Sequence, residues 1–212
     1  MTITLLSIFA TSFIVAFSGA MMPGPLLTVT ISESSRRGAC AGPLMIFGHG
    51  LLELLLVIAL LSGFAAVLHR EDVFICIALL GGATLFWMAT SMLKSLPTLR
   101  LSQDVTTTEK QKNLVIAGIV LSAANPYWLI WWASIGLGYI MHSARFGFMG
   151  VASFFVGHIL ADLVWYALIS FGIAGGRRFF SDTLYRRLIG GCAVFLLLFS
   201  CYFFYSGIEK LV

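Results

Sequence analysis

Six long apolar segments alternate with short polar segments along this chain. They cover about residues 3–31, 41–68, 73–93, 114–140, 147–172 and 188–208. Each segment is continuously apolar rather than alternating, and each reaches or exceeds the roughly 20 residues that a helix needs to cross a bilayer. The pattern therefore predicts an all-α integral membrane protein with six transmembrane helices.

The second half of the chain repeats the pattern of the first half. His49 with Glu53 returns as His158 with Asp162, at an offset of 109 residues. Each copy contains three predicted helices, which is an odd number, so the second copy must cross the membrane in the opposite sense to the first. The sequence thus predicts a 3+3 inverted repeat, an arrangement typical of secondary transporters.

The repeat also defines the domain organisation that we expect. Residues 1–212 form a single transmembrane domain, with repeat 1 over about 1–95 and repeat 2 over about 114–212. The segment between them, about 96–113, is polar at its centre and shows no hydrophobic periodicity. Such a pattern indicates a solvated linker between the two copies.

Helix-breaking residues interrupt the first apolar segment of each copy. Pro23-Gly24-Pro25 lies in the first segment and Asn125-Pro126 in the fourth. Proline removes a backbone donor and clashes with the preceding turn, while glycine lowers the cost of leaving helical geometry. Breaks at matching places predict that helices 1 and 4 are discontinuous and line a cavity. An ordinary proline kink is the alternative, above all at Asn125-Pro126.

Composition and charge support a membrane protein and set its orientation. The chain is 59% apolar and 10% charged, whereas soluble domains average about 45–50% and 25%. Ten of the 13 lysines and arginines lie in the loops after helices 1, 3 and 5. The positive-inside rule places these loops in the cytoplasm and both termini outside it. We therefore expect a multi-pass protein of the cytoplasmic (inner) cell membrane and no nucleic-acid partner, despite the net charge of +4.

Two acidic residues lie in the middle of apolar segments. Glu53 and Asp162 should be near the bilayer midplane, where an ionised group costs about 2.5–3.5 kcal/mol. This cost favours a functional role over the alternative, a protonated carboxyl group that only packs helices together. His49 and His158 lie one turn earlier on the same helix faces. They are candidates for a proton relay, a solute-binding group, a metal ligand or a structural partner.

Three tryptophans follow the Asn-Pro break. Trp128 is close to the middle of its segment, so we expect it in a cavity wall or gate. Trp131 and Trp132 are assigned to an interfacial aromatic belt, the common position of membrane tryptophans. Gly48 and Gly157 directly precede the two histidines. Close helix packing is the expected role of these glycines, with space for a ligand as the alternative.

Together, these motifs resemble the LysE/RhtB-type amino-acid exporters. The resemblance rests on Pro23-Gly24-Pro25, Gly38, Gly42, Gly48-His49 with Glu53, and Asn125-Pro126. It implies a protein with six hydrophobic segments that exports amino acids or related metabolites, using the membrane potential or the proton gradient. Many family members have lysine after Asn-Pro, whereas Tyr127 and Trp128 follow here. The missing cation means that the resemblance does not identify the exported solute.

The resulting hypothesis is a proton-coupled secondary exporter of an amino acid or similar small zwitterion, without cofactor or enzymatic activity. Its expected partners are the solute, protons and the lipid bilayer, and such a protein is compatible with a homo-oligomer. The candidate binding residues are Glu53, Asp162, His49, His158, Pro23, Gly24, Pro25, Asn125, Pro126 and Trp128.

Three alternatives compete with this hypothesis. A divalent metal-ion transporter would use the two histidines and two acids as ligands. A membrane-embedded metalloenzyme would use the same pairs, but the sequence contains no HExxH motif and no third ligand cluster. A structural or scaffolding membrane protein leaves the two midplane carboxylates unexplained.

Overall fold

The computed structural model describes residues 2–64, 67, 70–99, 113–176 and 181–210, and helices are the only regular secondary structure in these ranges. The elements are α1 (Thr2–Ala20), α2 (Pro25–Arg37), α3 (Ala41–Ala59), η1 (Leu60–Phe64), α5 (Glu71–Ser95), η2 (Leu96–Thr98), α6 (Leu114–Ala123), α7 (Pro126–Trp131), η3 (Trp132–Gly136), α8 (Leu137–Ala144), α9 (Gly147–Gly176) and α10 (Asp182–Glu209). Five helices are long and apolar enough to cross a membrane, or six if the bent unit from α6 to α8 is one span. The prediction of an all-helical membrane protein is confirmed. Most of the predicted linker, residues 100–112, lies outside the described residues.

The first apolar segment forms two separate helices. α1 is 19 residues long and is sufficient to span a membrane, whereas α2 has 13 residues and carries Arg36 and Arg37 in its last turn. Pro25 occupies the first turn of α2, where its missing N–H costs no helical hydrogen bond. α2 ends at Gly38, whose φ of +90° suits a residue without Cβ. The break therefore joins a spanning helix to a shorter and more polar one.

The fourth apolar segment is bent by 64° between α6 and the helix that begins at Pro126. Asn125 caps the second part, because its Oδ1 accepts a hydrogen bond from the Tyr127 N–H at 3.1 Å. A Cβ atom on Gly24 would lie 3.7 Å from Asn125 Nδ2. The two helix breaks consequently meet inside the molecule.

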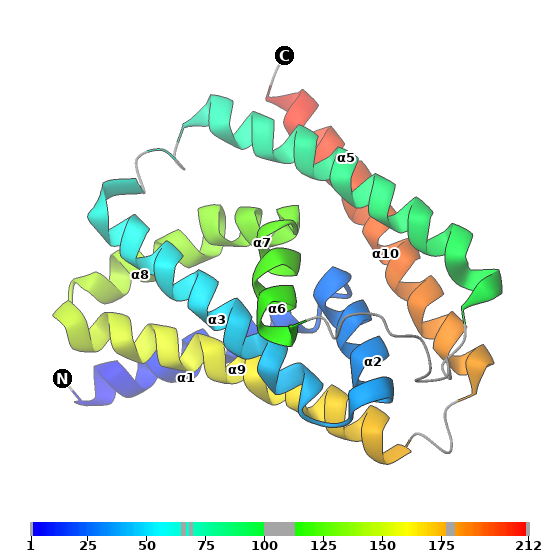
Figure 1. Cartoon of the computed structure of the whole chain (residues 1–212). Helices are drawn as coiled ribbons and strands as arrows, with labels where there is room; N and C mark the ends of the chain where they lie inside the picture. The colour runs from blue at the N-terminus through cyan, green and yellow to red at the C-terminus, as the bar shows by residue number, and fades with distance from the viewer. Residues whose placement is uncertain (1, 65–66, 68–69, 100–112, 177–180, 211–212) are drawn as a thin grey trace.

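Helices from the two halves of the chain pack closely against each other. α1 lies against α9, α3 against α6, and α5 against α10 (Figure 1). A Cβ atom on Gly48 would collide with the Val115 carbonyl group, so α3 and α6 are in backbone contact. The Ser12 hydroxyl of α1 donates to the Phe154 carbonyl of α9 at 2.7 Å. Small residues and buried hydroxyls are the usual means of helix association in lipid.

The surface of the bundle is apolar, while several polar side chains are buried. Leu80, Trp87 and Phe148 are among the large apolar residues exposed on α5 and α9. In contrast, Glu53 and Asp162 are buried, together with their neighbouring histidines. This distribution matches a bilayer as the surrounding solvent and makes the polar interior the place to look for function.

Candidate functional site

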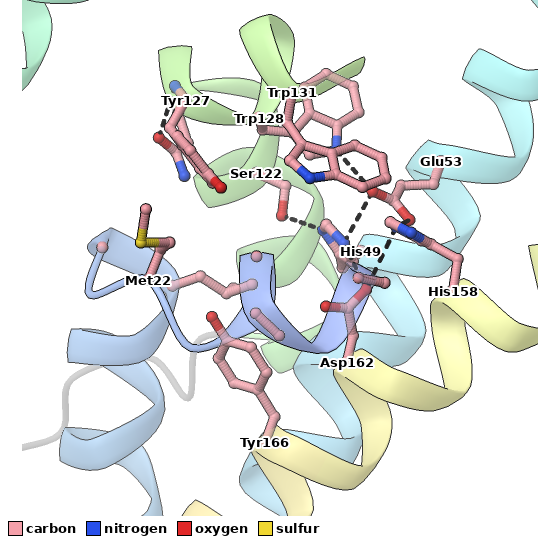
Figure 2. A pocket seen from close by; sticks show the side chains of 16 residues that line it. Met22, His49, Glu53, Ser122, Tyr127, Trp128, Trp131, His158, Asp162 and Tyr166 are labelled. Atoms are coloured by element: carbon pink, nitrogen blue, oxygen red, sulfur yellow. Dashed lines mark hydrogen bonds and ion pairs between the residues drawn. The ribbon is translucent and has the colours of Figure 1, made fainter. Parts of the chain in front are cut away.

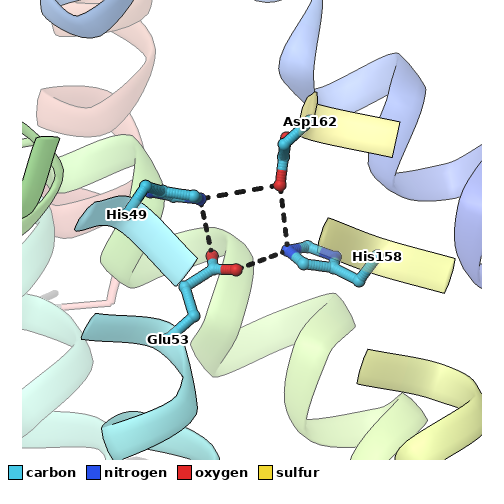
Figure 3. A group of neighbouring side chains, drawn as sticks. All are labelled: His49, Glu53, His158 and Asp162. Atoms are coloured by element: carbon cyan, nitrogen blue, oxygen red, sulfur yellow. Dashed lines mark ion pairs between the residues drawn. The ribbon is translucent and has the colours of Figure 1, made fainter. Parts of the chain in front are cut away.

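Two histidines and two acids form a closed ring between α3 and α9. His49 and Glu53 come from α3, and the i, i+4 spacing places them on one face of that helix. His158 and Asp162 have the same relation on α9. Figure 3 shows the four side chains turned toward one another. The sequence repeat thus becomes a pair of facing motifs in three dimensions.

The ring is tighter at Glu53 than at Asp162. His49 Nε2 lies 3.1 Å from Glu53 Oε1, and His158 Nε2 lies 3.0 Å from Glu53 Oε2. Both Nε2 atoms are 3.6 Å from Asp162 Oδ2. The two carboxylates therefore share the same histidines but have unequal contacts with them.

Two tryptophans increase this inequality. The Trp128 and Trp132 indole N–H groups donate to Glu53 Oε1 at 2.9 and 2.8 Å. An indole N–H can only donate, so Glu53 Oε1 must act as the acceptor. Asp162 Oδ2 is buried and accepts no hydrogen bond from the described residues. Glu53 is thus the anchored carboxylate and Asp162 the more available one.

The two histidines also differ in their outer contacts. His49 Nδ1 is 2.7 Å from the Ser122 hydroxyl of α6. His158 Nδ1 is buried and has no hydrogen-bond partner among the described residues. The His158 ring instead packs against Trp131, with 4.7 Å between ring centroids. His49 is therefore oriented by a hydrogen bond and His158 by aromatic packing.

A cavity opens beside the ring, where the two helix breaks meet (Figure 2). The ring residues line it together with Ala16, Gly19, Ala20, Met22, Gly24, Leu26, Ser122, Asn125, Tyr127, Trp128, Trp131 and Tyr166. None of these described lining residues is lysine or arginine. The cavity therefore combines two carboxylates with aromatic and small apolar walls.

Seven of the ten sequence-predicted site residues line this cavity. They are His49, Glu53, His158, Asp162, Gly24, Asn125 and Trp128. The three prolines do not line it: Pro23 lines a smaller neighbouring pocket, Pro25 is buried at the start of α2, and Pro126 packs against Gly81 of α5. The prolines therefore shape the cavity indirectly, because they set the direction in which the chain continues after each break.

The assignment of Trp131 and Trp132 to an interfacial belt is wrong. Trp131 is 8% exposed and Trp132 is fully buried, next to the ring. The Trp132 indole donates to Glu53 of α3 and the Trp131 ring packs against His158 of α9, so both indoles lie in the interior. One signal could have identified Trp132, because it follows Trp128 by four residues and so shares its helix face. Ser122 was also missed, and a lone serine in an apolar segment carries no such signal.

The fold and the site together define a multi-pass membrane protein with a buried polar cavity. The sequence model of the family described as LysE type translocator matches residues 17–207. The chain therefore belongs to the LysE type translocator family. It is also similar to the "Chemotactic transduction protein ChpE" of Pseudomonas aeruginosa, with 29% identity over 199 residues that cover 91% of this chain and 95% of that protein. No solved structure matches the chain.

Family membership assigns the general activity. The chain is a membrane transporter rather than an enzyme, and it works in a lipid bilayer on a small-molecule substrate. The resemblance to this family that the motifs indicated is thereby confirmed.

Proposed function

We propose that this transporter exports an amino acid or a similar small zwitterionic metabolite, coupled to the proton gradient. The observation that carries the proposal is the pair of buried carboxylates, Glu53 and Asp162, in one cavity where two helix breaks meet. Carboxylates suit the ammonium group that all amino acids carry. Discontinuous helices around a buried site are typical of secondary transporters.

The ammonium group of the solute binds at Asp162 in this proposal. Asp162 Oδ2 is buried without a hydrogen-bond donor among the described residues, whereas Glu53 already accepts from Trp128 and Trp132. A charged donor is worth most to a buried acceptor that lacks a partner. Glu53 then adds negative charge to the site, while its hydrogen bonds to the two tryptophans keep its side chain in place.

The carboxylate group of the solute binds at the N-terminus of α2. This end carries partial positive charge and has no side-chain cap, and Gly24 and Leu26 line the cavity there. The beginning of α7 is a weaker candidate, because Asn125 already accepts from the Tyr127 N–H and the helix has only six residues. A zwitterion can thus span the cavity from the ring to α2.

Alternating access follows from a 3+3 inverted repeat in the proposed mechanism. The 109-residue offset supports this arrangement, as does a reciprocal packing pattern. α1 packs on α9 and α6 packs on α3, so the first helix of each copy contacts the second helix of the other. Rocking one copy against the other would open the cavity to each side in turn. Protonation of the carboxylates would release the ammonium group and couple export to the proton gradient.

The basic loops support one orientation of the protein in the membrane. Ten of the 13 lysines and arginines lie on one predicted side of the membrane, which the positive-inside rule makes cytoplasmic. We therefore propose that the protein resides in the inner cell membrane with both termini outside the cytoplasm. Arg100, Lys110, Lys112, Arg177 and Arg178 belong to this count and lie outside the described residues.

Substitution of either buried carboxylate tests the mechanism. Glu53→Gln and Asp162→Asn should each abolish proton-coupled efflux from proteoliposomes while the protein remains folded, because neutral amides keep the shape but lose the charge. Asp72→Asn is the matched control, since Asp72 is exposed near the start of α5 and should leave efflux unchanged. Wild-type rate and coupling in both buried variants would refute the mechanism.

Transport of a divalent metal ion is a second candidate function. One observation favours it: ligand atoms of His49, Glu53, His158 and Asp162 all lie within 4.8 Å of one another. Proteoliposomes that contain a metal-sensitive dye would test it directly. Zn²⁺ uptake by the wild type that His49→Ala abolishes would favour this candidate, and an absence of uptake would reject it.

A further inference from the structure

We propose that the ring of His49, Glu53, His158 and Asp162 binds one divalent transition-metal ion, with Zn²⁺ as the best fit. The inference concerns binding, so it holds whether or not the ion is transported. One consequence rests on the proposed function. The ring cannot hold a metal ion and the ammonium group of a solute together, so a bound ion blocks export.

The donor set and its charge fit such an ion. Two imidazole nitrogens and two carboxylate oxygens are available, a combination that suits Zn²⁺ and related ions better than Mg²⁺ or Ca²⁺. All four residues are buried, where an unbalanced carboxylate is costly. One divalent cation balances both carboxylates while the imidazoles stay neutral.

The distances around the ring are close to those of a tetrahedral site. Zn²⁺ bonds of about 2.0–2.1 Å place neighbouring ligand atoms about 3.3–3.4 Å apart in a tetrahedron. The His49 and His158 Nε2 atoms lie 3.1 and 3.0 Å from different oxygens of Glu53, and both lie 3.6 Å from Asp162 Oδ2. One ligand atom from each of the four residues lies within 4.8 Å of the others, so the side chains would draw together around an ion.

Asp162 Oδ2 points to an occupant. It is buried and accepts no hydrogen bond from the described residues, and the nearest ring nitrogens, the Nε2 atoms of His49 and His158, are 3.6 Å away. An unsatisfied buried acceptor costs about 1–3 kcal/mol, and more when it is charged. A metal ion at the centre of the ring would satisfy this oxygen, and Glu53 would bind the same ion from the other side of the ring.

Outer contacts orient the ligands as they do in other metal sites. Metal-binding histidines usually use their second nitrogen in a hydrogen bond, and ligating carboxylates are hydrogen-bonded in turn. His49 Nδ1 is 2.7 Å from Ser122 Oγ, which can accept a hydrogen bond from the Nδ1–H group and leave the Nε2 lone pair facing the ring. Trp128 and Trp132 hold Glu53 in place from the other side.

The ring also has an access route. All four residues line the cavity at the meeting point of the helix breaks, so an ion that enters this cavity meets the ring directly. Ligand identity, spacing, outer contacts and access are the features that a metal site must show together. The ring offers suitable ligands at close spacing beside a cavity, and hydrogen bonds orient His49 and Glu53 from outside, while aromatic packing orients His158.

Titration of the EDTA-treated, detergent-purified protein with Co²⁺ tests the inference. Co²⁺ reports its geometry, because tetrahedral Co²⁺ absorbs visible light much more strongly than octahedral Co²⁺. We expect one Co²⁺ per chain with tetrahedral absorption, displaced by an equivalent of Zn²⁺, which such sites bind more tightly. No stoichiometric binding to the wild type, or an octahedral spectrum, would overturn the proposal.

Two histidine variants and a control locate the ion. His49→Ala and His158→Ala should each lose the tetrahedral spectrum and weaken Co²⁺ binding at least tenfold. His142→Ala should keep both, because His142 is exposed on α8 and belongs to no cluster with other described metal-ligating residues. Size-exclusion profiles show whether each variant is folded. Unchanged binding in a folded His158→Ala protein would place the ion elsewhere and refute the site.

This experiment separates the metal site from the proposed export. The titration needs no transport, so a protein that binds Co²⁺ but exports no amino acid refutes the exporter and leaves the metal site supported. A protein that exports amino acids but binds no Co²⁺ refutes the metal site alone. If both hold, Zn²⁺ should inhibit amino-acid efflux in the wild type, and efflux at full rate with Zn²⁺ bound would refute the predicted block.

Discussion

Glu53 accepts hydrogen bonds from two indole N–H groups. After Asn125-Pro126 the chain continues with Tyr127 and Trp128, and the Trp128 and Trp132 indoles both donate to Glu53. The tryptophans therefore hold the carboxyl group with fixed dipoles and add no positive charge. This arrangement retains the negative charge of the cavity, which favours a cationic group on the solute.

Trp132→Phe tests this role of the indoles. The variant keeps an aromatic ring but loses one hydrogen bond to Glu53, so we expect the free energy of unfolding to fall by about 1.5–3 kcal/mol. The pH profile of transport should change as well, because a donor to the carboxylate is gone. Trp87→Phe is the matched control, since Trp87 is 68% exposed on the apolar surface and should alter neither property. Identical pH profiles for Trp132→Phe and wild type would contradict the role.

The glycines in the helices show which packing contacts could be predicted from the sequence. Gly48 was expected to pack helices together, and it does, because its Cα lies against the Val115 carbonyl. Gly172 and Gly176 also have the spacing of a packing motif, yet a Cβ on Gly172 would meet nothing within 4 Å. The spacing identifies small residues on one helix face, but it cannot say whether that face meets protein or lipid.

Alanine substitutions at two of these glycines should separate the two environments. Gly48→Ala forces α3 and α6 apart and should lower the free energy of unfolding by about 1–3 kcal/mol. Gly172→Ala should be neutral or slightly stabilising, because alanine favours the helix and its methyl group has space. Thermal unfolding in detergent measures both effects. Equal stability of the two variants would be inconsistent with the close contact.

Among the elements, the membrane helices were predictable and the direction of the chain after each break was not. The apolar runs predicted α5, α9 and α10 because continuous hydrophobicity of this length is typical of helices that cross a membrane. A break in the first segment was expected, but the direction of α2 after it was not, since proline and glycine mark a break without specifying the angle that follows. For the same reason the sequence placed Trp132 at the membrane interface rather than beside Glu53.

Two asparagine caps allow the break in the fourth segment to be tested. Asn113 caps α6 and Asn125 caps α7, and each side chain accepts from backbone N–H groups of its own helix. Asn113→Ala should cost about 1 kcal/mol of stability and leave transport unchanged. Asn125→Ala should cost a similar amount and also slow transport severalfold, because Asn125 lines the cavity beside Gly24. Equal transport rates would show that this break has no functional role.

For the whole molecule, the orientation in the membrane rests on charge distribution. Cys40 is exposed in the loop that follows Arg36 and Arg37, which we predict to be cytoplasmic. In a variant that retains Cys40 as its single cysteine, a membrane-impermeant maleimide should label the protein only after the cells are permeabilised. Labelling of intact cells at the same rate would invert the proposed orientation.

Most of the candidate site was accessible from the sequence because the repeat marks it twice. An internal comparison identified His49, Glu53, His158 and Asp162 without any structure. The expected inverted repeat favours Glu53 and Asp162 facing each other, but no periodicity in these apolar helices shows that both histidines contact both acids in one ring. In the structure the two His/acid pairs lie together and form one shared site rather than two separate ones.

Efflux from proteoliposomes tests the central claim most directly. Liposomes that contain the wild-type protein would be loaded with a panel of labelled amino acids, and efflux would be measured with and without an imposed pH gradient. The proposed function predicts that one or a few amino acids leave faster when the gradient is present, and that Asp162→Asn removes this difference. No gradient-dependent efflux of any amino acid from correctly inserted protein would contradict it.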